Sequence, residues 1–175
     1  MSKAHGLVEL DGRYYKASVT CKLKSGSGRL LFSGAMPQEM LSPTKAAIDA
    51  CIHLDFLEGF DPDILGRSDL VIGIDSPAPV VGESLQLTLA VAVVAELLRR
   101  GVPAKFCYTG IVGPAGEVIP VDDIVAKRRA AKVLGFSAFV LPVSQLDYFS
   151  PEINQCPVTT IEEAISVTFF GDEHG

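Results

Sequence analysis

The 175-residue sequence is poor in cysteine, and the spacing of its cysteines excludes two kinds of site. Cys21, Cys51, Cys107 and Cys156 form no Cys-x-x-Cys pair, so the sequence indicates neither a disulfide framework nor a metal site. Each lies among apolar or strand-like neighbours. We therefore predict small buried thiols in a reducing compartment, and no bound metal.

A membrane-spanning run is also absent. The strongest apolar run, residues 85–95, is shorter than the roughly 18 residues that a membrane-spanning helix needs. The first residues, MSKAHGLVELDG, lack the apolar stretch and cleavage site of a signal peptide. We therefore expect a soluble, cytoplasmic protein with no membrane partner.

Positive charge is in deficit, since 15 Lys and Arg face 21 Asp and Glu, with a pI near 5.0. This balance disfavours a nucleic-acid partner, because affinity for nucleic acid depends on neutralising phosphates. Residues 1–30 are the exception, with six basic and two acidic side chains. They form either a docking edge for an acidic partner or a neighbouring subunit, or a solvated guard of exposed strands, which is the simpler interpretation.

Glycine-rich cofactor motifs are missing as well. The stretch SGSGRLLFSG at 25–34 has neither the G-x-x-x-x-G-K-[ST] run nor the G-x-G-x-x-G spacing of nucleotide sites. A hairpin turn is the simpler interpretation of these glycines, and no cofactor is expected.

What is present is the composition of one globular domain spanning residues 1–175, with 48% hydrophobic and 21% charged residues. Residues 1–40 predict an antiparallel β meander with strands at 7–10, 13–23 and 29–32, turning at Asp11-Gly12 and at the SGSG stretch.

Helices and strands follow one another after this meander. Ser42 is the expected N-cap, and Pro43 the first residue, of a helix that ends at Gly59. A helix from Ser84 to Arg100 is apolar nearly all round, so we expect it at the centre of the core. The other predicted elements are strands at 69–75, 105–112, 117–121 and 137–141, and helices at 122–134 and 160–169, which together give a mixed α/β (α+β) fold.

Ser84 is a candidate nucleophile. Gly82-Glu83-Ser84 begins like a nucleophile elbow, but position 86 is Gln rather than Gly, so that motif fails. A Ser-His-Asp arrangement would have to use the sequence's three histidines, His5, His53 and His174.

Lys127 is an alternative base, because a helix period of 100° places it on the apolar stripe of the 122–134 helix. Its side chain either extends to water or is buried with a lowered pKa. Only a lysine with a pKa near 7 to 8 would be a useful base at neutral pH.

Several short motifs occur together between residues 82 and 142. They are Gly82-x-Ser84, Thr109-Gly110, Gly116-x-Val118-x-Pro120-Val121, and Lys127 followed by Ala130-Ala131. This arrangement resembles the proteolytic domain of Lon-type proteases, strongly over 82–142 and weakly elsewhere. The resemblance implies a Lon proteolytic domain-like mixed sheet with packed helices, similar to ribosomal protein S5 domain 2, with a catalytic segment at 69–142.

The resemblance also implies roles for individual residues. Ser84 would be the nucleophile and Lys127 the general base of a Ser-Lys dyad, working through an acyl-enzyme. Thr109 would supply a supporting hydroxyl near the lysine. Backbone N–H groups of Gly82, Glu83, Ser84 and Leu85 would hold the oxyanion.

The implied protein is a standalone, ATP-independent serine endopeptidase that acts on flexible or unfolded polypeptides. The 175 residues leave no room for an ATPase module, so a motor or targeting partner would be a separate chain. The resemblance also suggests a homo-oligomeric ring, commonly a hexamer. The alternative is an inactive Lon-like domain that serves as an oligomerisation or interaction module, as in Lon-like domains attached to some bacterial DNA-repair ATPases.

The sequence departs from the family pattern around the site. Glu83 replaces a usual Pro, Leu85-Gln86 replaces Ala-Gly, Ile111 replaces a Glu, and Asp122-Asp123 replaces two glycines. These changes predict a loop of different shape, or a pairing of Glu83 with Lys127 that would hold the lysine charged.

Overall fold

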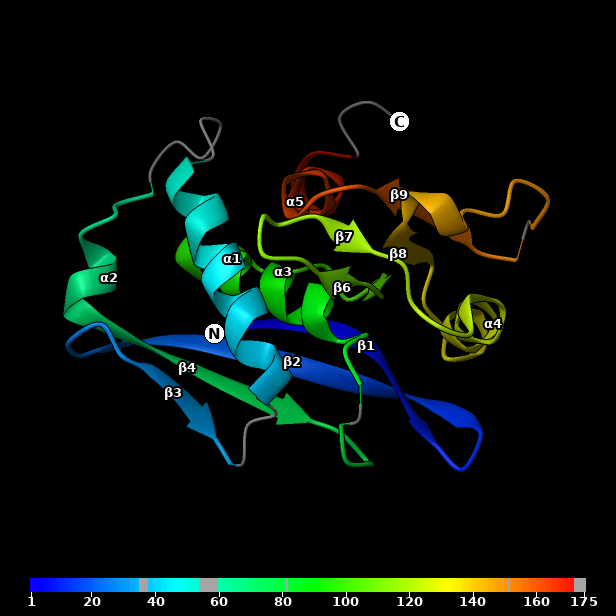
Figure 1. Cartoon of the computed structure of the whole chain (residues 1–175), viewed down its shortest axis with the longest axis horizontal. Helices are drawn as coiled ribbons and strands as arrows, with labels where there is room; N and C mark the ends of the chain where they lie inside the picture. The colour runs from blue at the N-terminus through cyan, green and yellow to red at the C-terminus, as the bar shows by residue number, and fades with distance from the viewer. Residues whose placement is uncertain (35–37, 54–59, 81, 151, 172–175) are drawn as a thin grey trace.

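The computed structural model describes residues 1–34, 38–53, 60–80, 82–150 and 152–171. Its main feature is a mixed seven-stranded sheet in the order β3-β4-β2-β1-β5-β8-β9, beside a two-stranded sheet of β6 and β7 (Figure 1). The mixed α/β (α+β) prediction is confirmed. The strands are β1 (Ser2–Leu10), β2 (Arg13–Ser25), β3 (Leu30–Ser33), β4 (Ser68–Asp75), β5 (Phe106–Tyr108), β6 (Ile111–Val112), β7 (Val118–Ile119), β8 (Ala138–Pro142) and β9 (Asn154–Val158).

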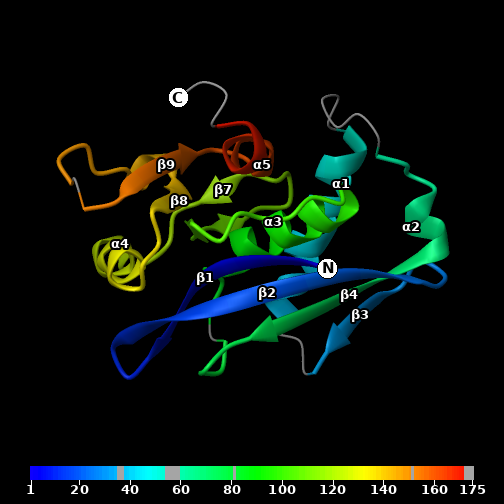
Figure 2. The same ribbon diagram turned by 180° about the vertical axis from the view of Figure 1, so that it is seen from behind.

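Helices cover both faces of this sheet. The α-helices are α1 (Leu41–His53), α2 (Ile64–Arg67), α3 (Gln86–Leu97), α4 (Ile124–Val133) and α5 (Ile161–Phe170), with short 3-10 turns η1 (Gln38–Met40) and η2 (Val143–Gln145). Helices α1, α3 and α5 pack together on one face, and α4 lies on the other (Figures 1 and 2). Alternate strand residues therefore enter two apolar clusters, as Tyr108 and Cys107 do on β5.

The helix predicted to form the core does so. Of the 12 residues of α3, 11 are buried, between α1, α5 and strands β1 and β2. Its buried polar residue Gln86 donates to the Glu39 carbonyl at 2.9 Å and accepts from the Val112 N–H at 2.9 Å. Both ends of this amide are therefore satisfied inside the core.

The first hairpin is confirmed, but the meander is not. Asp11 and Gly12 both have positive φ, 52° and 79°, as a two-residue turn between twisted strands requires, and β1 pairs with β2 throughout. The third strand instead pairs in parallel with β4, which lies between it and β2. The antiparallel meander over residues 1–40 is therefore wrong for β3. The glycine-rich turn before β3 is held beside the start of β4, where the Asp69 carboxylate accepts from the backbone N–H groups of Ser27 and Arg29.

Two other boundaries differ from prediction. Helix α1 begins at Leu41, directly after η1, so Ser42 lies inside the helix and is not its N-cap. Pro43 is still in the first turn, where a missing N–H costs no helical hydrogen bond. The predicted end at Gly59 lies outside the described residues.

The predicted strand at 105–112 divides into β5 and β6, which belong to different sheets. The chain turns at Gly110, where an added Cβ would lie 2.8 Å from a side-chain carbon of Val118. Strand β9 was not predicted, because its residues, NQCPV, are partly polar and include a proline. Within the described residues, no helix has both the length and the apolar character needed to cross a membrane.

Candidate active site

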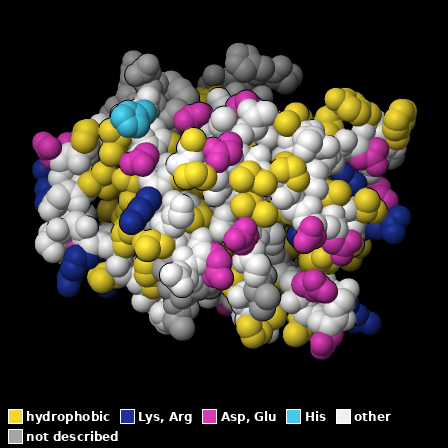
Figure 3. All heavy atoms as spheres, viewed as in Figure 1, with side chains coloured by type: hydrophobic (Ala, Val, Ile, Leu, Met, Phe, Trp, Pro, Cys, Tyr) yellow, Lys and Arg dark blue, Asp and Glu magenta, His cyan; other side chains and the backbone are white. Residues whose placement is uncertain are grey.

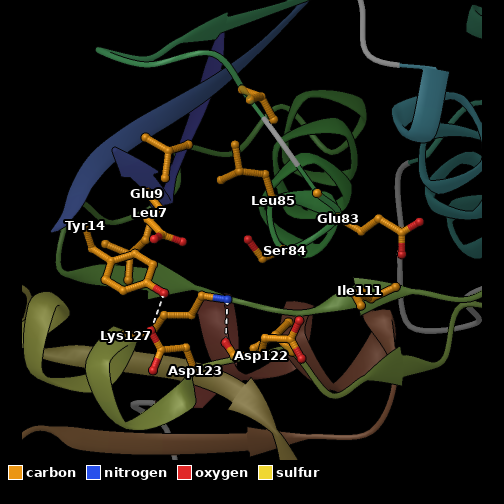
Figure 4. Close-up of a pocket in the computed structure, with 14 residues that line it drawn as sticks. Leu7, Glu9, Tyr14, Glu83, Ser84, Leu85, Ile111, Asp122, Asp123 and Lys127 are labelled. Carbon is orange, nitrogen blue, oxygen red and sulfur yellow. Dashed lines mark hydrogen bonds between the residues drawn. The ribbon is translucent and has the colours of Figure 1, made fainter. Parts of the chain in front are cut away.

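A pocket of about 230 Å³ lies where three distant parts of the chain meet (Figure 4). The β1–β2 hairpin contributes Glu9 and Tyr14, the turn before α3 contributes residues 82–85, and the start of α4 contributes residues 121–123 and Lys127. Ser84 and Lys127, proposed from sequence as partners, therefore line one pocket although 43 positions separate their numbers.

Ser84 lies in the turn that leads directly into α3, and its side chain is half-buried. The turn is attached to Gly110. The Ser84 carbonyl accepts from the Gly110 N–H at 3.2 Å, and the Gly110 carbonyl accepts from the Leu87 N–H at 3.0 Å. The close packing of Gly110 against Val118 and Leu87 leaves no space for a side chain there. The Thr109-Gly110 motif thus fixes the backbone that carries Ser84.

Lys127 is buried rather than extended to water, with 7% of its surface exposed. Its position in the second turn of α4 directs the side chain into the pocket, as Figure 4 shows. The Nζ atom donates to the Asp122 carbonyl at 2.8 Å and lies 5.9 Å from the centre of the Tyr14 ring. Of the two alternatives for this lysine, the structure has the buried one.

Burial determines the direction in which the pKa of Lys127 is shifted. Desolvation lowers the pKa of Lys127 below its ordinary value, while the carboxylates of Asp122, Asp123 and Glu9 act in the opposite direction. Desolvation is the larger effect, so the structure favours the neutral amine more than water does. A neutral amine has a lone pair that can accept a proton.

The surroundings of the lysine are otherwise acidic. Glu9, Glu83, Asp122 and Asp123 all line the pocket, and among the described lining residues Lys127 is the single basic one. The same excess of acid is visible on the molecular face in Figure 3, where Asp and Glu side chains lie across the centre and most Lys and Arg lie near the edges. A bound substrate would therefore meet a negative potential.

Glu83 does not pair with Lys127. Its side chain is exposed and points away from the lysine in Figure 4, and no ion pair joins the two among the described residues. The Glu83–Lys127 pairing that the sequence left open is therefore absent from this structure. Gly82 has φ of +87°, which glycine adopts without strain, and Leu85 is buried against the pocket.

Thr109 lies apart from these residues. It is 1% exposed at the end of β5, where its N–H donates to the Val140 carbonyl at 3.0 Å. It is not a lining residue of the pocket, and in the described part of the chain its hydroxyl makes no hydrogen bond to Lys127. The expected supporting contact is therefore not made in this structure.

Ser84 and Lys127 face the same hollow without a hydrogen bond between them in the part of the chain that the structure describes (Figure 4). The amine is held by the Asp122 carbonyl instead. Catalytic hydrogen bonds are often long in the absence of substrate and tighten when it binds. The arrangement is that of a hydroxyl and a buried amine that share a pocket.

Tyr14 and Glu9 are pocket residues that sequence reasoning missed. They pair across the β1–β2 hairpin, and the Tyr14 hydroxyl donates to the Asp123 carboxylate at 2.7 Å. Because Tyr14 and Asp123 are 109 positions apart, no local pattern joins them. The one available signal was the Asp-Gly turn, which places both residues beside a hairpin tip.

Comparison with known proteins adds independent information. Residues 12–170 match the family model of the Lon protease (S16) C-terminal proteolytic domain. The chain is 27% identical over 126 residues to Lon protease 1 of Bacillus subtilis (strain 168), which covers 71% of this chain and 16% of that protein.

Two further relatives are also similar to this chain over a small part of their own length. Lon protease of Dictyoglomus thermophilum is 27% identical over 150 residues, which cover 85% of this chain and 18% of that protein. DNA repair protein RadA of Chlamydia trachomatis serovar D is 28% identical over 105 residues, which cover 58% of this chain and 23% of that protein. The chain thus spans less than a quarter of each of these three relatives.

Proposed function

The chain belongs to the Lon protease (S16) C-terminal proteolytic domain family, and from this membership we propose that it is a serine endopeptidase with a Ser84–Lys127 dyad. The observation that carries the proposal is the burial of the Lys127 amine in the same pocket as the Ser84 hydroxyl. A buried lysine without a partner carboxylate within ion-pair distance is rare in proteins, and proton transfer gives it a reason.

In the proposed reaction, the Ser84 oxygen attacks the carbonyl carbon of the scissile peptide bond while the neutral Lys127 amine takes the hydroxyl proton. The resulting ammonium returns the proton to the leaving amine, and an acyl-enzyme remains on Ser84. Water then attacks the ester, with Lys127 again accepting and returning a proton. One N–H of the amine donates to the Asp122 carbonyl, which leaves its lone pair available to the serine.

We propose that the turn before α3 stabilises the oxyanion. This turn carries Ser84 and Leu85, whose N–H groups donate to no backbone carbonyl of the described residues. They lie at the N-terminal end of α3, where the helix dipole favours negative charge. Gly82 and Glu83 complete the backbone of this turn.

The remaining parts of the proposal concern the substrate and the assembly. We propose flexible or unfolded polypeptides as substrates and cleavage that needs no ATP, with any motor or targeting partner supplied by another chain. We also propose a homo-oligomeric ring of six subunits, to be tested by sedimentation velocity, and a cytoplasmic location. A monomer at all working concentrations would contradict the ring.

The proposal is tested with purified protein and fluorescently labelled casein as a disordered substrate. Ser84→Ala and Lys127→Gln are expected to reduce cleavage by at least about a thousandfold, because the nucleophile and its base act as a unit. Ser144→Ala, in the exposed η2 turn, is the matched serine control. Unchanged cleavage by both site variants would disprove the dyad.

An inactive Lon-like interaction module is the competing function, and the similarity to DNA repair protein RadA is its support. It is the weaker proposal, since the serine and the lysine share a pocket and Glu83 does not neutralise the lysine. A fluorophosphonate probe separates the two functions. Covalent labelling at Ser84 that is lost in Lys127→Gln supports the peptidase, and no labelling of the native protein supports the module.

A further inference from the structure

Tyr14 connects the β1–β2 hairpin to the start of α4. Its hydroxyl donates to the Asp123 Oδ2 atom at 2.7 Å, and its ring faces Lys127 Nζ (Figure 4). The pKa of Tyr14 is raised by burial and by the neighbouring Asp123, so the phenol keeps its proton and remains a donor. The Tyr14 side chain therefore binds the Asp123 carboxylate with its hydroxyl and faces the amine of Lys127, the proposed base, with its ring.

Asp123 has an unusual backbone conformation for a residue that precedes a helix. Its φ of 58° and ψ of 42° place it in the left-handed region, and its side chain makes no capping hydrogen bond to α4. An aspartate at this position ordinarily has extended backbone angles and caps the helix. Glycine adopts left-handed backbone angles without steric cost, whereas a residue with a Cβ does not. Among the described residues, the bond from Tyr14 is the one hydrogen bond that the Asp123 side chain makes.

The position of this carboxylate matters for Lys127. Asp123, Asp122 and Glu9 all favour the charged ammonium, yet in the described residues none of them comes within ion-pair distance of Nζ. Glu83 lines the same pocket but points away. Since Asp123 is only four residues before Lys127, a rotation of its side chain could bring the two charges together.

We infer that Tyr14 is a positioning residue, whose hydroxyl holds the Asp123 carboxylate against the hairpin and keeps it from forming an ion pair with Lys127. The inference rests on the proposed function for its importance to catalysis, but not for its test. Without the hydroxyl, the carboxylate is free to turn toward the amine and to stabilise its protonated form. The hydrogen bond also spreads the carboxylate charge over a second group, which weakens its attraction for the ammonium.

The experiment measures the titration of Lys127 without using catalysis. Trace acetylation by acetic anhydride at a series of pH values, read by peptide mass spectrometry, reports the fraction of Lys127 that is neutral. Tyr14→Phe is expected to slow labelling of Lys127 at neutral pH by up to about tenfold, the factor that one pH unit in the midpoint represents. Asp123→Gly is expected to speed it, because glycine suits the left-handed backbone and removes the opposite charge.

The double variant is the decisive measurement. If Tyr14 acts through Asp123, Tyr14→Phe has no effect on Lys127 labelling in the Asp123→Gly background. Tyr15→Phe is the matched control, since the ring of this neighbouring residue packs against the core and does not line the pocket. Equal effects of Tyr14→Phe in both backgrounds, no effect in either, or the same effect from Tyr15→Phe would overturn the inference.

The pH profile of peptide cleavage gives a second readout. Tyr14→Phe is expected to move the acidic limb of kcat/KM to higher pH while keeping the plateau, whereas simple loss of folded protein would lower the rate at every pH. If Ser84→Ala leaves cleavage unchanged, the proposed function fails, and the labelling results still decide the role of Tyr14.

Discussion

The Lys127 amine is buried at a cost to folding. Its folded-state pKa is lowered, so between that value and the ordinary value of 10.5 the unfolded chain holds a proton that the folded chain does not. The free energy of unfolding therefore rises with pH through this window, and below it the full cost of burying a charge is present. Stability and the proposed catalysis make opposite demands on this residue.

The substitution Lys127→Met tests whether the buried amine lowers stability. Methionine fills the same space without a charge, so the free energy of unfolding at pH 7 is expected to increase by about 0.5 to 2 kcal/mol, while peptide cleavage is lost. The gain is expected to disappear as the pH rises above the ordinary lysine pKa, because the native amine is then neutral in both states. Urea unfolding at pH 7 and at about pH 11 measures both effects, and a Lys127→Met variant that is less stable than the native protein at pH 7 would contradict them.

The pocket carboxylates predict a preference in substrate charge. Glu9, Glu83, Asp122 and Asp123 surround a site with one basic side chain, so a peptide with Lys or Arg beside the scissile bond is expected to have a higher kcat/KM than its Asp or Glu counterpart. About 1 kcal/mol, or roughly fivefold, is reasonable for partly exposed charges. Added salt should reduce the preference.

Glu83→Gln gives the matching protein variant for this preference. Glu83 is exposed and Glu117, which lies outside the pocket, is a suitable control position for the same substitution. Matched peptide pairs assayed against both variants measure the contribution of one carboxylate. A higher kcat/KM for the acidic peptides would count against the electrostatic explanation. So would a preference for basic peptides that Glu117→Gln removes and Glu83→Gln leaves unchanged.

At the scale of elements, the turn between β2 and β3 is held against the start of β4. The Asp69 side chain accepts hydrogen bonds from the Ser27 and Arg29 N–H groups and from the Arg29 guanidinium, and these hold the pKa of Asp69 at about 2. Gly26 lies directly against this carboxylate, where an added Cβ would overlap the Asp69 carboxylate oxygens. The turn is therefore shaped around one acidic group.

Gly26→Ala is expected to reduce the free energy of unfolding by about 1 to 3 kcal/mol, the usual cost of a steric conflict in a packed region. Gly101→Ala, where an added Cβ meets no atom within 4 Å, is the control. Thermal unfolding of the two variants measures the difference. Equal melting temperatures would show that the turn can rearrange around the added Cβ without loss of stability.

The same carboxylate predicts acid sensitivity. The folded-state pKa of Asp69 is lower than the ordinary value of 3.8, so its contribution to stability is present above about pH 4 and is lost as the pH falls toward 2. Asp69→Asn is expected to lower the melting temperature at pH 7 and to flatten this part of the pH dependence. Parallel curves for the two proteins between pH 4 and 2 would contradict the assignment.

These elements show what local sequence patterns can and cannot predict. The Asp11-Gly12 hairpin, the apolar helix α3 and the helix α4 were predictable, because turn chemistry and periodicity are local. The place of β3 was not, since its pairing partner β4 and the Asp69 carboxylate that holds its turn lie about 40 residues further along the chain. The break between β5 and β6 depends on the packing of Gly110 against Val118, which is equally non-local.

The candidate site follows the same division. Ser84 and Lys127 were found because short motifs surround them, and the structure brings them to one pocket. Tyr14 was not found, because its position becomes meaningful only when the hairpin lies beside α4. Thr109 was assigned a contact with Lys127 from a resemblance, whereas here the Asp122 carbonyl holds the amine.

At the scale of the whole molecule, the site is assembled from segments that are distant in the sequence. The hairpin, the turn before α3 and the start of α4 are far apart along the chain but line one pocket, and β1 lies between β2 and β5 in the sheet. The pocket, at about 230 Å³, is smaller than the roughly 300 to 1,000 Å³ of typical small-molecule sites. A volume of this size holds a few side chains, as the proposed cleavage of unfolded polypeptides requires.

This size predicts how cleavage depends on the stability of the substrate. If unfolded polypeptide is the substrate, as proposed, the rate is expected to follow the unfolded fraction of the substrate, about tenfold for each 1.4 kcal/mol of its stability. A stable reporter domain and a series of its destabilised variants, with identical sequences around the cleavage site, measure this slope. The 175-residue chain is expected to give the same slope with and without ATP. A cleavage rate that does not change with substrate stability would contradict the proposed cleavage of unfolded polypeptides. A rate that rises when ATP is added to the purified chain would contradict its independence of ATP.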